Sequence, residues 1–305
     1  MDTLTEFALK ERYSKVKDLR SELEKVKKLV DWESFLALFP KRDYRVGRRG
    51  YHTIIKLKLL FLQAWYGISD EELEYQVNDR LSFQQFLDFP KSIPDYSTVW
   101  RFREYLTESD LAENIWQELQ RQIEGHNLQV KEGVIQDARF IHADPGKTNS
   151  GMNGRGREAK TSRSKDGTWT KKNAKSIFGF KLHTKMQKGS KIIKEFAVTT
   201  ASTHDNRIDL ADEDDIMYRD RGYSGSKTKA KGDATMKKGN LSILEKLRNK
   251  RIAKRRAEGE HPYAMMERKF KAGRTKLTTI PRVYVQQMFV SIVYNISRLR
   301  FLLST

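Results

Sequence analysis

The sequence predicts an α/β domain preceded by an all-helical N-terminal part, and three observations lead to this fold class. Short helical patterns with capping signals fill residues 31–126. From residue 131 onward, apolar strand patterns and turn signals follow one another as three strands, a short helix, a strand and further helices, which is the order expected of an α/β domain. Hydrophobic residues make up 38% of the 305-residue chain, enough to build a core.

Residues 1–30 are expected to form a helix with one apolar stripe. Val16, Leu19, Leu23, Val26 and Val30 follow the 3-4-3-4 spacing of a coiled-coil seam. Because the seam is short, the pattern is equally compatible with dimerisation and with packing against the rest of the chain.

Residues 31–127 are interpreted as a helical DNA-binding or scaffold domain. Ser69 and Glu72 predict a capping box that opens a helix over residues 70–77. Asp95 or Ser97 is expected to cap a second helix over residues 98–106.

The charge of this helical part favours a scaffold, although its tight turns also allow a helix-turn-helix. Residues 69–113 hold 4 basic and 11 acidic residues, a net charge of −7. Only residues 41–58 are basic enough to contact DNA.

Residues 128–305 contain the segments expected to form the sheet. Val134, Ile135 and Ala138 predict a buried strand in KEGVIQDARFI, and the polar stretch 144–176 that follows is expected to be a loop. The further expected elements are strands in FGFKLHTKMQ and KIIKEFAVTTAS with a hairpin turn at 188–190, a short helix over 204–210, a strand in DDIMYRD that ends in a turn at 220–222, helices over 241–258 and 264–271, and a long C-terminal helix.

The charge distribution points to an anionic partner. The chain carries a net charge of +19, and the segments 144–175 (9 basic, 3 acidic) and 221–259 (13 basic, 3 acidic) supply +16 of it. Nucleic acid is the first candidate, and a basic protein such as a ribosome-associated factor is the alternative. The absence of cysteine excludes disulfides, cysteine-bound zinc and thiol catalysis.

Signals for export and for membrane insertion are not expected in this chain. The N-terminus lacks an apolar signal region, and the apolar stretch 283–303 is interrupted by Gln, Asn and Arg side chains, so it predicts a buried helix. The expected setting is the cytoplasm or the nucleoid.

Three carboxylates are the candidates for a metal-binding catalytic site. Asp137 lies inside an apolar strand, Asp220 ends a second buried strand, and Glu260 follows a basic helix and precedes His261. Each has an ordinary interpretation: a hydrogen-bonded core aspartate, a turn residue and a surface glutamate. Together they are the oxygen ligands that Mg²⁺ prefers, and two such ions about 4 Å apart can drive phosphodiester cleavage in a basic groove.

Several motifs, taken in order, resemble the DDE transposases of insertion-sequence family five, within the larger family-four/five group. The helical part matches in YHTIIKLKLLFLQAWYGISDEELEYQVNDRLSFQQFL and PDYSTVWRFREYL. The α/β part matches in VIQDARFI, GFKLH, TTASTHDN, YRDRGYSG and EHPYAMMERKF. Each motif alone is weak, whereas their order and spacing together are specific.

The resemblance implies a ribonuclease-H-like catalytic domain, a mixed sheet flanked by helices, over residues 128–305 with a basic insert at 144–175. It implies that Asp137, Asp220 and Glu260 form the catalytic, metal-binding triad for two Mg²⁺ ions, with Mn²⁺ as a substitute. The implied activity is cleavage at mobile-element ends and strand transfer. The implied partners are double-stranded DNA, as terminal inverted repeats and target, and further copies of the chain in a homodimer or larger assembly, in a bacterial or archaeal cytoplasm with no membrane contact.

The glutamate motif departs from the family pattern. Glu267 occupies the position where members often carry a lysine, and Ala253 replaces a tyrosine, whereas the expected arginine is present as Arg256. Glu258 and Glu267 therefore compete with Glu260 for the role of third carboxylate, and the His-Pro that follows favours Glu260.

Basic residues of the two charged segments and of the motifs are the candidates for DNA contacts. His183 and His204 are interpreted as structural, with a contact to DNA as the alternative. A nuclease without strand transfer and a DNA-binding remnant remain the alternative functions. The candidate DNA-binding residues are Arg155, Arg157, Lys160, Arg163, Lys171, Lys172, Lys175, Lys181, Arg221, Lys250, Arg251, Arg255, Arg256, Arg268 and Lys269.

Overall fold

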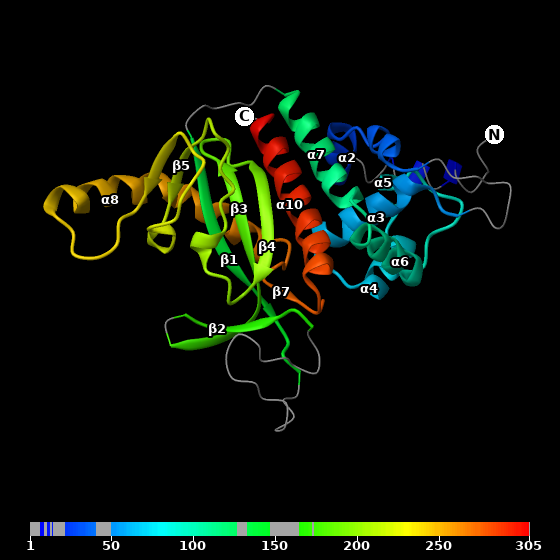
Figure 1. The fold of residues 1–305 in the computed structure, drawn as a ribbon. Coiled ribbons are helices and arrows are strands. Elements are labelled where there is room, and N and C mark those ends of the chain that lie inside the picture. The colour runs from blue at the N-terminus through cyan, green and yellow to red at the C-terminus, as the bar shows by residue number, and fades with distance from the viewer. Residues whose placement is uncertain are drawn as a thin grey trace. The chain divides into compact units, whose positions relative to one another are not determined.

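The computed structural model describes residues 7–8, 11–12, 14, 22–40, 50–126, 133–146, 165–172 and 174–304. The chain forms two compact units, Met1–His126 with Met288–Thr305, and Asn127–Gln287. In their described parts, the first is helical and the second holds the sheet (Figure 1). The sequence-based prediction placed a domain boundary after residue 127 and assigned residues 288–305 to the domain that contains the sheet. They belong with the helices, because Phe289, Ile292 and Ile296 line the same pocket as helical-unit side chains.

The helical unit buries aromatic side chains from successive helices. The Trp32 ring meets the edges of Phe61 and Phe86 at centroid distances of 5.6 and 5.5 Å. Its elements are α2 (Glu22–Leu29), η1 (Ser34–Leu38), α3 (Thr53–Tyr66), α4 (Asp70–Asp79), α5 (Leu81–Phe86), α6 (Tyr96–Thr107), α7 (Leu111–Glu124) and the second half of α10 (Ile280–Leu302).

Two helices begin at side-chain caps where the sequence placed them. The Ser69 side chain accepts a hydrogen bond from the Glu72 N–H at the start of α4, which is one of the two bonds of the expected capping box, while the Glu72 carboxylate accepts from Gln76. Asp95 accepts a hydrogen bond from the Thr98 N–H at the start of α6. Asp95 is thus the cap of the second helix.

The apolar stripe of the first helix turns inward over the part that is described. Leu23, Val26 and Val30 are buried, whereas Val16 and Leu19 lie outside the described residues. The described half of the stripe therefore packs within the chain, which is the second of the two expected alternatives.

The basic stretch expected to contact DNA is only partly described, because residues 41–49 lie outside the described residues. Lys56 and Lys58 are buried in α3. The Lys58 ammonium donates to Asp88 at 2.6 Å, and the Lys56 ammonium lies 4.3 Å from the centre of the Phe102 ring. These lysines stabilise the helical unit and are not exposed to a ligand.

Over its described residues, the second unit is built on a seven-stranded mixed sheet. Across it, β4, β3, β1, β5 and β6 lie in that order; β2 also pairs with β3, and β7 with β1. Strand β3 is antiparallel to β1 and β4, while β1, β5 and β6 are parallel. The strands are β1 (Val134–Ala143), β2 (Thr168–Lys172), β3 (Lys175–Gln187), β4 (Ile193–Thr200), β5 (Ile216–Arg219), β6 (Gly232–Thr235) and β7 (Arg274–Thr275).

Three of these strands differ from the sequence-based expectation. The expected loop 144–176 contains β2 and the start of β3, because Thr168–Lys172 pair with Gly179–Lys175 through backbone hydrogen bonds that polar side chains do not prevent. Residues 147–164 of that loop lie outside the described residues. The short strands β6 and β7 were not expected, whereas the hairpin turn between β3 and β4 is confirmed.

The helices of this unit also begin or end at other residues than the sequence predicts. The expected helix over 204–210 is only a turn, η2 (Asp205–Arg207), because the Gln136 side chain takes the Ile208 carbonyl and the Leu210 N–H. Ser242 and Glu245 form a capping box that opens α8 (Ile243–Arg256), which runs beside β5 (Figure 1). The next helix, α9 (Glu260–Arg268), begins earlier than expected because a proline is tolerated in a first turn.

The long α10 is apolar but has buried polar side chains, Gln287, Ser291 and Asn295 among them. In the part of the chain that the structure describes, no helix has the length and apolar character needed to cross a membrane.

Candidate active site

The parallel pairing of β1 with β5 brings two of the predicted carboxylates to neighbouring positions. Val134 is paired with Met217 and Ile135 with Tyr218. Continuing this register by two residues places Asp137 beside Asp220, which directly follows β5. Because successive strand residues alternate between faces, Asp137 and Asp220 fall on the same face as the Ile135–Tyr218 pair.

Asp137 lies in an environment that resists its ionisation. Burial raises the pKa of Asp137 to about 6, although the nearby Arg256 lowers it, as does a hydrogen bond from the Ala138 N–H. The charges of Asp220 and Asp205 raise it further. Carboxylates from separate segments therefore lie close enough to repel one another, which is the electrostatic setting that a bound cation relieves.

Asp220 is held by the backbone that follows it. Its Oδ1 accepts a hydrogen bond of 2.7 Å from the Gly222 N–H and begins the short helix η3 (Arg221–Tyr223). A Cβ on Gly222 would stand 2.9 Å from this oxygen, so the close approach of backbone and carboxylate requires glycine here.

Helix α9 runs along β1 with matching periods. Gly259 packs on Ile135, the Tyr263 hydroxyl donates to the Asp137 carbonyl at 2.7 Å, and Glu267 pairs with Arg139. Four residues of helix and two of strand both advance by roughly 6–7 Å, so three successive contacts stay in step. The hydrogen bond between Tyr263 of α9 and Asp137 of β1 is therefore part of a continuous interface between this helix and this strand.

Glu260 is exposed at the first position of α9, immediately after Gly259. It is three residues before Tyr263, which contacts Asp137, and residues at this spacing share one side of a helix. Arg256, which also contacts Asp137, ends the preceding helix α8.

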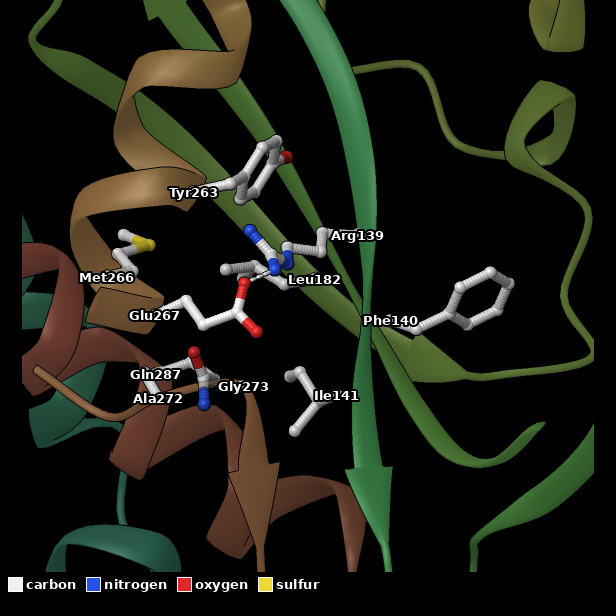
Figure 2. A pocket seen from close by; sticks show the side chains of 10 residues that line it. All are labelled: Arg139, Phe140, Ile141, Leu182, Tyr263, Met266, Glu267, Ala272, Gly273 and Gln287. Atoms are coloured by element: carbon white, nitrogen blue, oxygen red, sulfur yellow. Dashed lines mark ion pairs between the residues drawn. The ribbon is translucent and has the colours of Figure 1, made fainter.

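The two competing glutamates make other contacts. Glu258 accepts a hydrogen bond of 3.1 Å from the Gly189 N–H in the β3–β4 turn. Glu267 forms an ion pair with Arg139 in a small pocket between α9 and β1, as Figure 2 shows, while Phe140 points to the other side of the strand.

The donor set is suited to a hard cation, although its side chains do not enclose one. Asp137, Asp220 and Glu260 offer only oxygen ligands, as Mg²⁺ prefers. Over the described ranges, no three His, Cys, Asp or Glu side chains stand close enough together to hold a metal ion. Any ion held here would need at least one of these side chains to turn toward it.

The candidate DNA-binding residues fall into three groups. Arg155, Arg157, Lys160 and Arg163 lie outside the described residues. Lys181 and Arg256 are tied to aspartates, because Lys181 is buried against Asp205 and Arg256 contacts Asp137. The third group is exposed or half-buried: Lys171, Lys172, Lys175, Arg221, Lys250, Arg251, Arg255, Arg268 and Lys269.

A groove between α8 and the β5–β6 edge gathers further positive charge. Arg248, Arg251, Lys254 and Arg255 line it, together with Tyr218. Arg248 and Lys254 are not among the residues predicted from the sequence to bind DNA. The run of basic residues that ends at Arg256 indicates a positively charged helix, but it does not show which of its side chains line one groove.

The two histidines interpreted as structural have different settings. His183 is fully buried, and its Nε2 lies 2.9 Å from the Thr199 hydroxyl. Burial lowers the pKa of His183 to about 4. His204 accepts a hydrogen bond from the Asn206 N–H and begins η2.

Both units match known protein families. Residues 10–105 match the family described as Transposase domain (DUF772). Residues 128–296, more than half of the chain, match the family described as Transposase DDE domain. No solved structure matches the chain.

Proposed function

Because this chain belongs to the family of transposases with a DDE domain, we propose that it cuts DNA at the ends of a mobile element and joins those ends to target DNA. Within that family we assign it to insertion-sequence family five and its sheet unit to the ribonuclease-H-like fold. The order of the strands supports the fold assignment, with β3 antiparallel between β4 and β1.

One observation carries the proposal: the parallel pairing of β1 with β5 gives Asp137, on β1, and Asp220, directly after β5, neighbouring positions. Glu260, the first residue of α9, directly follows Gly259, which packs on Ile135 of β1. Ligands of α/β sheets bind at the carboxyl ends of parallel strands, where Asp220 is found.

Asp137, Asp220 and Glu260 would hold two Mg²⁺ ions, or Mn²⁺ in their place. When bound, these ions would activate a water or a 3′-hydroxyl and stabilise the leaving oxygen of a phosphodiester. Arg256 lowers the pKa of Asp137 against the effect of burial, and the Tyr263 hydroxyl donates to the carbonyl of the same residue.

The reaction then has two steps in the same site. In the first, water attacks the phosphodiester at the element's end, and the bond to the leaving oxygen breaks to release a 3′-hydroxyl. In the second, that hydroxyl attacks a phosphodiester of the target, forming the new junction and releasing a target 3′-hydroxyl.

Glu260 is the preferred third carboxylate because its rivals are engaged elsewhere. Glu258 holds the β3–β4 turn, and Glu267 is paired with Arg139. Glu260 lies three residues before Tyr263, the α9 residue that contacts Asp137, and its side chain remains exposed to a ligand.

The DNA would lie along the exposed cations of α8 and of the β2–β3 hairpin. We propose that at least two copies of the chain act together, since two element ends must be paired, and that they act on the nucleoid in a bacterial or archaeal cytoplasm.

The test is cleavage and strand transfer on a labelled duplex that carries the terminal repeat flanking the gene, with Mg²⁺ or Mn²⁺. Wild type is compared with Asp137→Asn, Asp220→Asn and Glu260→Gln, and Glu258→Gln and Glu267→Gln are the matched controls. We expect cutting at the repeat boundary and joined products from wild type and both controls, and a loss of both products of at least about 10³-fold in the three other variants.

Other outcomes would redirect the assignment. Full activity of Glu260→Gln with loss in Glu258→Gln or Glu267→Gln would move the third carboxylate. Cutting without joined products would indicate a nuclease, and binding of the repeat without metal-dependent cutting would indicate a DNA-binding remnant.

A further inference from the structure

A fourth carboxylate lies beside the two aspartates of the candidate site. Asp205 comes from the short helix η2, and Asp220 precedes η3; these two turns contact each other. A Cβ placed on Gly222 would stand 2.9 Å from Oδ1 of Asp220 and 3.4 Å from Oδ2 of Asp205. The two carboxylates thus flank one glycine, whose lack of a side chain leaves the space between them open.

A lysine fixes the position of Asp205. The Lys181 ammonium donates 2.7 Å to Oδ1 of Asp205 and 2.6 Å to the Thr203 carbonyl. Only one of the two Asp205 oxygens is engaged by this bond, and Oδ2 is the oxygen that lies toward Gly222 and Asp220.

An unsatisfied hydroxyl lies near the same carboxylates. Tyr223 is 1% exposed, and within the described residues its hydroxyl has no hydrogen-bond partner. Burial raises the pKa of Tyr223 above its usual value, and the charges of Tyr263, Asp205, Asp137 and Asp220 add to the effect. Arg219 lies over the Tyr223 ring at 5.5 Å and holds it in place. A buried donor without a partner is costly unless a ligand satisfies it.

We propose that Asp205 is a fourth carboxylate of the metal site, and that the Tyr223 hydroxyl donates a hydrogen bond to a metal-bound water or a phosphate oxygen there. This inference rests on the proposed function, because it needs Asp137 and Asp220 to be metal ligands. Asp205 contributes a ligand oxygen through Oδ2 while Lys181 holds Oδ1.

The competing explanation is that Asp205 only neutralises a buried lysine, and the chain offers a matched control for it. Lys185, four residues further along the same face of β3, is also buried, and its ammonium donates 2.8 Å to Asp212 and lies 2.9 Å from a carboxylate oxygen of Glu195. Asp205→Asn and Asp212→Asn each remove an aspartate that accepts from a buried lysine, although Lys185 keeps its pair with Glu195, and only the first variant removes a carboxylate beside Asp220.

The experiment measures Mn²⁺ binding to the full chain by electron paramagnetic resonance and by the Mn²⁺-induced rise in melting temperature. Asp205→Asn should weaken Mn²⁺ binding by about tenfold or more, while Asp212→Asn stays within about twofold of wild type. Tyr223→Phe should melt at or above the wild-type temperature without metal, because it removes an unpaired buried hydroxyl, and should gain less from Mn²⁺.

The outcomes separate this inference from the proposed function. If Asp137→Asn abolishes Mn²⁺ binding while Asp205→Asn binds as wild type does, the fourth carboxylate is wrong and the metal site stands. If Asp137→Asn also binds normally, the metal site itself is wrong. An unchanged Mn²⁺ response in Tyr223→Phe would overturn the role of the hydroxyl.

Discussion

Nη1 of Arg256 lies 3.1 Å from Oδ2 of Asp137, so the last turn of α8 is joined to the middle of β1. Arg256, which was predicted to bind DNA, is also the cation that counters the effect of burial on the pKa of Asp137. A positive charge near the site can thus act on the carboxylate as well.

Replacing Arg256 with Gln should make Asp137 harder to ionise, because the guanidinium lowers the pKa of that carboxyl. The acid limb of the pH–rate profile for DNA cleavage should move up by about 1 pH unit or more. Arg255→Gln is the control, since Arg255 donates to the Tyr218 hydroxyl and not to Asp137. An acid limb that stays in place in Arg256→Gln would contradict the coupling.

Adding a methyl group at Gly259 should destabilise the protein. A Cβ there would stand 2.7 Å from Cγ2 of Ile135, and overpacking of this kind costs about 1–3 kcal/mol of unfolding free energy. Urea unfolding of Gly259→Ala, Ile135→Ala and the double variant measures it. The double variant should lose less stability than the two single losses combined; strict additivity would mean that the two residues do not touch.

Removing the Tyr263 hydroxyl should cost about 1–3 kcal/mol of unfolding free energy, because the Asp137 carbonyl loses its donor and Thr184 loses its partner. Tyr263→Phe combined with Thr184→Val should cost less than the two changes added, since both break the same bond. The measurement is again denaturant unfolding, and a neutral Tyr263→Phe would show that the hydroxyl is not needed.

The buried His183 should make the fold sensitive to acid. Its pKa is lowered to about 4 by burial, whereas an unfolded histidine titrates near pH 6.5. Below pH 6.5 the unfolded chain therefore binds more protons, so stability falls as pH drops from about 6.5 to about 4, by up to about 3 kcal/mol. Unfolding of His183→Gln measured over this range should show a flatter dependence, and His142→Gln, at an exposed position on β1, should keep the wild-type slope.

Local chemistry was predictable from the sequence where neighbouring residues decide it. The caps at Ser69 and Asp95 and the turn between β3 and β4 depend on residues a few positions apart. The neighbouring positions of Asp137 and Asp220 could be anticipated because each lies on or directly after a strand with an apolar pattern.

Contacts between distant segments were not predictable in the same way. The sequence does not distinguish an exposed lysine, such as Lys171, from a lysine that is buried against a carboxylate, such as Lys181. Strand β2 has no apolar pattern, and it forms because the backbone of β3 is available to it. The contact of Tyr263 with Asp137 depends on the packing of α9 on β1, which no single segment encodes.

The contacts of α8 and α9 with β1 also set when the site can form during synthesis. Arg256 and Tyr263 reach Asp137 across 119 and 126 residues of sequence. A ribosome adding about 5–20 residues per second completes β1 several seconds before it makes α9. Until then the nascent chain already carries Asp137, Asp220 and much of its positive charge, but not Glu260. A chain terminated before α9 would therefore lack the third carboxylate proposed for the site.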